Sequence, residues 1–121
     1  MGVGNALSLA VKCQKLLEKE KISSELISFH SPKPLDSKLL KRLFTNKKLI
    51  ITIEEHGLIG GVGSAILEWA NNYKKDANKI LRFGGPDEFL TGCGNQKEAR
   101  NRIGLSSKKI SMKIIGFLKK K

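Results

Sequence analysis

Two kinds of segment alternate along the chain. In one kind, hydrophobic residues recur with the period of a helix, and in the other they form the short apolar run of a buried strand. The segments with helical spacing are residues 5–20, 37–44, 64–75, 95–104 and 106–120. The segments that read as strands are residues 23–31, 47–55 and 78–85. Because strands that alternate with helices are typical of parallel βαβ units, the pattern predicts a three-layer α/β/α sandwich on a mostly parallel sheet.

Individual residues mark where some of these elements begin and end. Pro32 and Pro34 should stop the first of the three strands, because proline cannot donate to a sheet ladder. Asp36 or Ser37 can cap the helix that follows. The apolar run within residues 47–55 is nearly continuous rather than alternating, which indicates a strand buried on both faces of the sheet.

The length and the charge of the chain narrow its possible functions. At 121 residues and 40% hydrophobic composition, residues 1–121 are expected to form one domain with its own core. Lysine and arginine number 23 against 11 acidic residues, which gives a net charge of +12. The lysines are scattered through every segment and aromatic residues are few, so we expect a solvated surface, and this pattern does not favour a nucleic-acid partner.

The chain also carries signals about its compartment. No apolar run approaches the length that spans a bilayer, and the first residues do not read as a signal peptide, so no membrane partner is expected. Cys13 and Cys93 lie far apart and form no CxxC pair, which argues against a zinc site or a disulfide framework. A cytoplasmic location follows as the expectation.

One stretch, LIITIEEHGLIGGVGSAILEWA at residues 49–70, carries the candidate chemistry. Gly60, Gly61 and Gly63 precede a helix, and free amides at a helix N-terminus attract anions such as phosphate. The spacing is neither G-x-G-x-x-G nor a P-loop. The competing interpretation is that these glycines allow helix and strand to approach closely and permit a positive φ.

The same stretch also invites an acid–base interpretation. Glu54, Glu55 and His56 end a parallel strand, where ligands of α/β folds gather, and histidine carries protons near neutral pH. The alternative is that His56 is a hydrogen-bonded structural residue. A metal site is not expected from two histidines without a surrounding ligand set, and Cys13 and Cys93 have no assigned base.

Four segments together resemble the C-terminal domain of the transketolase family, which includes 1-deoxyxylulose-5-phosphate synthase and the beta subunits of 2-oxoacid dehydrogenases. The segments are LISFHSPKPLD, the stretch at 49–70, LRFGGPDEFLTGCG and IGLSSKKISMKIIGFL. They occur in order and cover nearly the whole chain. The resemblance implies a structural or assembly role for residues at the strand ends. The candidate domain-interface or supporting residues are Glu54, Glu55, His56, Gly60, Gly61, Gly63 and Ser64.

The resemblance also implies what the chain does not carry. Thiamine diphosphate and Mg would lie between two other domains, which supply the GDG-type motif and the activating glutamate. Neither has a counterpart here, so we expect no cofactor, metal or catalytic residue in this chain and no catalysis by it alone. The expected partner is a polypeptide with the cofactor-binding domains, in a homo- or hetero-oligomer. The alternative function is a non-catalytic interaction or regulatory module, and the third is a basic nucleic-acid-binding domain.

The chain departs from the family pattern at its beginning. The family opens this domain with a hydrophobic strand, then a glycine-containing turn and a helix. GVGNALSLAVKCQKLL matches the turn and the helix, but the first strand is predicted to be missing, because Met1 stands where it should end. A fragment, a split gene and a misplaced start codon would each produce this pattern.

Overall fold

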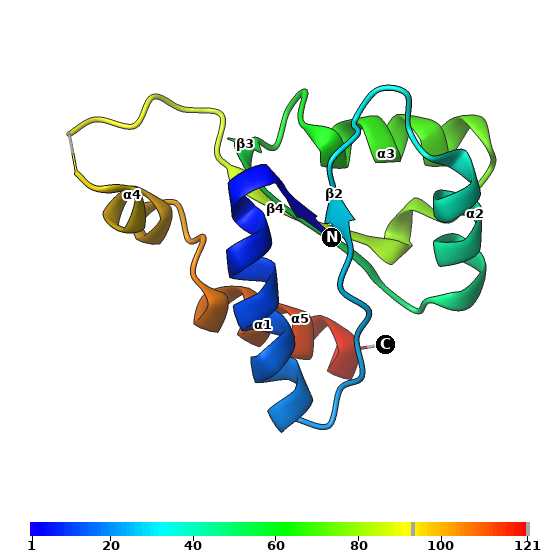
Figure 1. Cartoon of the computed structure of the whole chain (residues 1–121), viewed down its shortest axis with the longest axis horizontal. Helices are drawn as coiled ribbons and strands as arrows, with labels where there is room; N and C mark the ends of the chain where they lie inside the picture. Colours follow the sequence, from blue (N-terminus) through cyan, green and yellow to red (C-terminus); the bar gives the residue numbers. More distant parts are fainter. Residues whose placement is uncertain (93, 121) are drawn as a thin grey trace.

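A parallel sheet forms the centre of the computed structural model, which describes residues 1–92 and 94–120 (Figure 1). Within these residues the sheet has four strands in the order β2-β1-β3-β4, and all neighbouring pairs are parallel. The strands are β1 (Gly2–Val3), β2 (Ser28–Phe29), β3 (Ile50–Gly57) and β4 (Ile80–Gly85). The predicted α/β architecture with a parallel sheet is confirmed.

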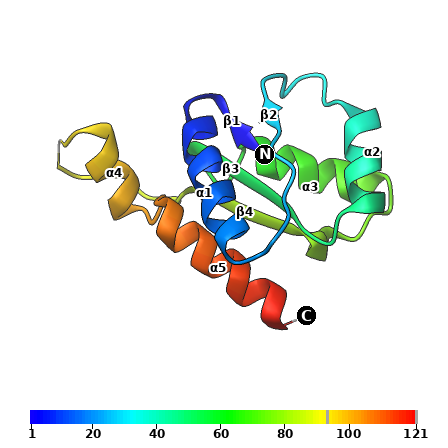
Figure 2. The same ribbon diagram turned by 60° about the horizontal axis from the view of Figure 1, so that its bottom comes forward.

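Helices cover both faces of this sheet. They are α1 (Leu7–Lys19), α2 (Ser37–Asn46), α3 (Val62–Asn72), α4 (Gln96–Arg102) and α5 (Ser107–Lys120), with short 3-10 turns η1 (Gly4–Ala6) and η2 (Ala77–Lys79). Figure 2 shows α1 and α5 side by side on one face, whereas α2 and α3 lie on the other. Every predicted helix is present, within a few residues of its expected ends.

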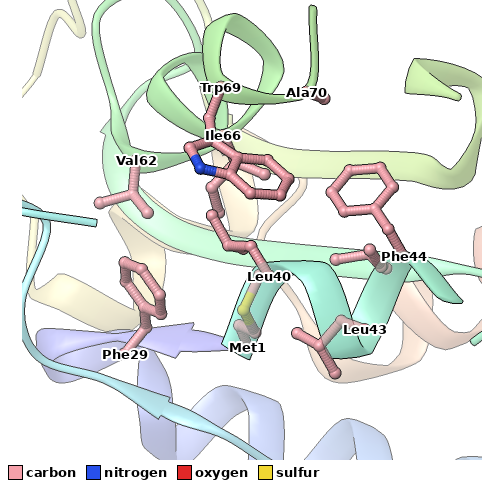
Figure 3. Packing of buried hydrophobic residues seen from close by; sticks show 10 residues of the cluster. Met1, Phe29, Leu40, Leu43, Phe44, Val62, Ile66, Trp69 and Ala70 are labelled. Carbon is pink, nitrogen blue, oxygen red and sulfur yellow. The ribbon is translucent and has the colours of Figure 1, made fainter. Parts of the chain in front are cut away.

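Each face of the sheet has its own buried cluster. The cluster under α2 and α3, shown in Figure 3, is Met1, Phe29, Leu40, Leu43, Phe44, Ile50, Val62, Ile66, Trp69 and Ala70. The cluster between the sheet, α1 and α5 is Ala6, Leu9, Ala10, Cys13, Leu17, Ile53, Phe83, Leu105, Ile110 and Ile114. Since Ile50 and Ile53 of β3 serve opposite clusters, this strand is buried on both faces, as its apolar run predicted.

The expectation of a missing first strand is wrong in part. Gly2 and Val3 form β1, and this two-residue strand occupies the central position between β2 and β3. Gly2 N donates to Ile27 O at 3.0 Å, and Ile53 N donates to Met1 O at 2.9 Å. So short a strand can still join β2 and β3, because it makes main-chain hydrogen bonds on both of its sides. The first strand is therefore present but short.

Other expectations have simple outcomes in the described residues. The strand expected over 23–31 is regular only at Ser28–Phe29. The Asp36 carboxylate caps α2 by accepting from Leu39 N at 2.9 Å, as predicted. No helix among residues 1–92 and 94–120 is both long and apolar enough to cross a bilayer.

Of the two cysteines, only Cys13 lies within the described residues. Cys13 is a free thiol within the α1 cluster, and burial raises its pKa, which disfavours the nucleophilic thiolate. Cys93 lies outside the described residues.

Candidate functional site

The turn between β3 and α3 is organised around the buried carboxylate of Glu54. Its Oε2 accepts from Val62 N at 2.7 Å and its Oε1 accepts from Gly63 N at 2.9 Å, and the residue is 0% exposed. Free amides at a helix N-terminus carry partial positive charge and form anion sites. Here an anion from the chain itself takes two of these amides, so this end of α3 is not available as a phosphate cradle.

The glycines of this turn are required by close packing and by backbone conformation. A Cβ on Gly61 would lie 2.5 Å from Glu54 Oε2, and a Cβ on Gly63 would lie 2.8 Å from Thr52 Oγ1. Gly60 has a φ of +76°, which L residues with side chains rarely adopt. Gly61 and Gly63 let α3 approach β3 closely enough to meet Glu54, and Gly60 supplies the positive φ, which are the two structural reasons that the sequence offered for these glycines.

A second set of hydrogen bonds fixes the loop that connects β3 to α3. The carbonyl oxygen of Leu58 accepts from Ser64 Oγ at 2.7 Å and from Arg82 Nη1 at 2.8 Å. Arg82 Nη1 also donates to Ser64 Oγ at 3.0 Å, and Leu58 N donates to Gly85 O at 2.9 Å. The loop is thus tied to β4 as well as to α3. Sequence reasoning missed Arg82, although a lone cation inside an apolar strand was a signal for it.

Glu55 links the end of β3 to α4, which lies far away in the sequence. Its Oε1 accepts from Arg100 Nε at 2.5 Å and from Gln96 Nε2 at 2.9 Å. Arg100 Nη2 also donates to Asn5 O at 3.2 Å. Because the Glu55 side chain is one-third exposed, solvent screens this ion pair, and its main effect is to position α4. Arg100 and Gln96 were not predicted, because nothing local in the sequence connects them to Glu55.

His56 lies at the exposed carboxyl end of β3. Its side chain is exposed, and within the described residues its imidazole makes no hydrogen bond. Because the carboxyl ends of parallel strands lie at one edge of a sheet, the loops after β3 and β4 flank the same edge. Two apolar side chains of these loops are strongly exposed, Ile59 at 74% and Phe89 at 99%. His56 therefore lies at the same edge of the sheet as these two loops.

Among the described residues, the α3 N-terminus and the acidic, histidine and cysteine side chains do not provide a site for a diphosphate with its metal ion. The candidate cradle at α3 is already closed by Glu54. Among the described residues no three His, Cys, Asp or Glu side chains come together as a metal-ligand group. The seven candidate residues therefore divide into a buried supporting group and an exposed group. The buried or partly buried members are Glu54, Gly61, Gly63 and Ser64, and the exposed members are Glu55, His56 and Gly60.

Comparison with known proteins places this architecture in context. A family model described as "Transketolase, C-terminal domain" matches residues 1–110. The chain is 36% identical over 118 residues to 1-deoxy-D-xylulose-5-phosphate synthase of Geobacillus sp. (strain WCH70), covering 98% of the chain and 19% of the relative. It is 37% identical over 120 residues to the enzyme of the same name from Carboxydothermus hydrogenoformans, covering 99% of the chain and 19% of the relative.

A solved structure shares the fold of the chain. It is described as "Split gene transketolase, inactive beta4 tetramer" and superposes with a TM-score of 0.84 at 26% identity. The match covers 98% of this chain and 38% of that one. The chain thus spans about a fifth of the length of the curated relatives and under two-fifths of this structural relative.

Proposed function

The chain belongs to the family of transketolase C-terminal domains, and from that premise we propose that it serves a transketolase-type, thiamine-diphosphate-dependent enzyme as its C-terminal domain or subunit. In this role it contributes to assembly and does not catalyse by itself. The leading activity of the assembled enzyme is formation of 1-deoxyxylulose 5-phosphate, because the relatives at 36% and 37% identity carry that name. The broader alternative within the family is two-carbon transfer between sugar phosphates.

The observation that carries the assembly role is the occupation of the α3 N-terminus by Glu54. Its buried carboxylate forms two charge-assisted hydrogen bonds to the turn, and these bonds stabilise the conformation of this edge of the sheet. Thiamine diphosphate and Mg are assigned in this proposal to the domains of a partner polypeptide. A cytoplasmic location is also part of the proposal and rests on the cysteine spacing.

The surface beside Glu54 is the proposed contact with the cofactor-binding domains. Ile59 and Phe89 supply exposed apolar area, while Glu55 and His56 supply polar groups at the same sheet edge. Interfaces commonly combine such an apolar centre with polar neighbours. The buried group of Glu54, Gly61, Gly63 and Ser64 would support this surface from below by holding the β3–α3 loop.

Reconstitution tests the proposal directly. The chain is mixed with a polypeptide that carries the cofactor-binding domains of a transketolase-type enzyme, and complex formation and 1-deoxyxylulose 5-phosphate synthesis are measured with thiamine diphosphate and Mg. We expect activity only in the mixture, and weaker assembly with Phe89→Ser. Met112→Ser is the matched control, since Met112 is 63% exposed but lies on α5. Equal loss with both variants, or no assembly at any concentration, would contradict the proposal.

The non-catalytic interaction or regulatory module remains the alternative, and the same experiment separates it. Such a module would form a stable, monodisperse species alone and bind its target without restoring activity. Binding to DNA or RNA that falls steeply with salt would instead support the third function, since phosphate contacts release counterions.

A further inference from the structure

Helix α5 packs on the sheet with one side and turns its other side to solvent. Ile110 and Ile114 are buried in the cluster that α5 shares with α1. Figure 2 shows α5 at the margin of the molecule, so its opposite side is not covered by another element of the described residues. The exposed residues of α5 are Lys108, Lys109, Met112, Lys113, Lys119 and Lys120. We call this side of the helix, together with the half-buried Gly116, the lysine face.

Met112 and Gly116 form the centre line of the lysine face, and lysines flank this line on both sides. The two residues are about one turn apart, and with about 3.6 residues per turn the line between them lies opposite the buried Ile114. The line divides the lysines into two groups, Lys108 with Lys119, and Lys109 with Lys113 and Lys120. A narrow line of non-polar residues with charges along both sides is the pattern by which helices pair in coiled coils.

Packing within the described residues does not explain either residue of this centre line. The Met112 side chain is 63% exposed. A Cβ added to Gly116 would meet nothing within 4 Å, so close packing does not require glycine there. Glycine inside a helix nevertheless destabilises it relative to alanine. The centre line thus offers an exposed apolar side chain beside a stretch of backbone that a second helix can approach closely.

The lysines of α5 lie where they destabilise the helix. The helix contains no acidic residue, and none of the ion pairs between described residues involves one of its lysines. Lys109 and Lys113 are four positions apart and repel each other. Lys108 and Lys109 lie in the first turn, where the helix dipole disfavours cations. An anionic partner would offset all of these repulsions.

These features together select one kind of partner. A second copy that docked through the same face would be repelled by its own lysines. Binding to a membrane surface needs an apolar face, whereas Met112 is the only exposed apolar residue of the lysine face. The face exposes no arginine or aromatic residue that would read bases or stack on them, which argues against a nucleic acid. An amphipathic helix with acidic flanks complements both the centre line and the lysines.

We propose that the lysine face docks an acidic amphipathic helix of a partner protein. Apolar side chains of that helix pack on Met112 and Gly116, and its carboxylates pair with the lysines on both flanks. Such charge complementarity speeds association and makes it sensitive to salt. The lysine face includes neither Ile59 nor Phe89, so this partner binds beside the cofactor-binding polypeptide and not in its place. The proposal stands on α5 itself and does not depend on the proposed enzyme.

Binding of a designed helix tests the proposal with the chain as it is. The probe is a fluorescein-labelled peptide of three repeats of Glu-Leu-Ala-Gln-Leu-Glu-Gln, in which the leucines form one stripe and the glutamates flank it. The control peptide has the same composition in an order that spreads the leucines around the helix. We expect saturable one-to-one binding by fluorescence anisotropy, at least tenfold weaker for the control peptide. Equal binding of the two peptides would overturn the proposal, because charge alone would then suffice.

Matched variants locate the binding on α5. Lys109→Glu combined with Lys113→Glu should weaken binding at least tenfold, yet raise the melting temperature, because it removes cations from positions where they repel each other and the helix dipole. Lys38→Glu combined with Lys74→Glu makes the same change of charge at exposed positions on α2 and just after α3, and should weaken binding less than threefold. Gly116→Gln should weaken binding at least fivefold with α5 intact, since its side chain would cover the centre line.

Three further results would overturn the proposal. The first is equal binding by the two double variants, and the second is unchanged binding by Gly116→Gln. The third is tighter binding of a short DNA duplex than of the probe, which would make a nucleic acid the occupant. The comparison of the two peptides on the unmodified chain decides the question even if a variant fails to fold.

Discussion

The Glu54 carboxylate and the Val62 amide, eight positions apart, are joined by a buried hydrogen bond of 2.7 Å. This bond, with its partner at Gly63 N, ties the last buried residue of β3 to the first turn of α3. The Glu54 carboxylate is therefore the anion that occupies the N-terminus of α3. The turn that most resembles a ligand site thus connects β3 to α3, and its contribution to the free energy of unfolding can be measured.

Replacement of Glu54 by Gln should lower the free energy of unfolding by about 2–3 kcal/mol. Gln keeps one acceptor, but it places an NH₂ donor against an amide donor and loses a charge-assisted hydrogen bond. Urea denaturation followed by circular dichroism measures the change. Glu55→Gln is the control, because its partly exposed ion pair should contribute less than about 1 kcal/mol. Equal effects of the two variants would show that Glu54 does not anchor α3.

Two glycines should respond to alanine in opposite directions. Gly61→Ala places a Cβ 2.5 Å from Glu54 Oε2 and 2.8 Å from Gly57 O, so we expect a loss of roughly 1–3 kcal/mol. Gly116 lies within α5, and a Cβ added there would meet nothing within 4 Å, so Gly116→Ala should add about 0.5–1 kcal/mol. Thermal melts of both variants give the signs. A stabilised Gly61→Ala would mean that the β3–α3 turn relaxes freely.

Glu54 and Glu55 also show how far the sequence can predict the fold and the site. The helices, β3 and the close packing of the glycines follow from apolar periodicity and residue type, which are local properties. The pairing of Glu54 with amides eight and nine residues away depends on the path of the loop, and the contact of Glu55 with Arg100 depends on where α4 docks. Neither is encoded in local spacing. The two-residue β1 was missed because so short a strand has no periodicity to detect.

His56→Asn should leave the fold intact and weaken assembly. The side chain is exposed and makes no hydrogen bond within the described residues, so its loss should change the melting temperature by less than about two degrees. At the proposed contact surface, the same change should reduce reconstituted activity several-fold at limiting partner concentration. Circular dichroism and the reconstitution assay are compared on one preparation. Loss of helical signal would make His56 a fold residue after all.

The stability of the chain should rise between pH 6 and pH 8. Burial lowers the pKa of the Met1 amine from 8.0 to about 6, so the folded state binds fewer protons in this window than the unfolded state. Stability then increases with pH, and about 2–3 kcal/mol is lost as the pH falls through this range. Acetylation of the Met1 amine should remove this part of the pH dependence. Intact mass must first establish that Met1 is retained, and identical profiles for both forms would contradict the assignment.

Joining four apolar residues, such as Val-Ile-Leu-Ile, directly to Met1 should stabilise the domain by lengthening β1 between β2 and β3. Burial of four large side chains contributes about 6–12 kcal/mol. Ordering four residues costs about 1–2 kcal/mol each. The net gain of a few kcal/mol corresponds to a rise in melting temperature of roughly ten degrees for a domain of this size.

The control for this extension is Ser-Asn-Ser-Asn in the same position, which adds the same backbone without apolar side chains. It should raise the melting temperature little, since polar side chains would be buried against Leu43, Leu17 and Leu118 without partners. Both proteins are compared by thermal melt and size exclusion in one buffer. If the apolar extension adds no more stability than the polar one, its side chains do not pack against Leu43, Leu17 and Leu118. The continuation of the β1 register beyond Met1 would then be wrong.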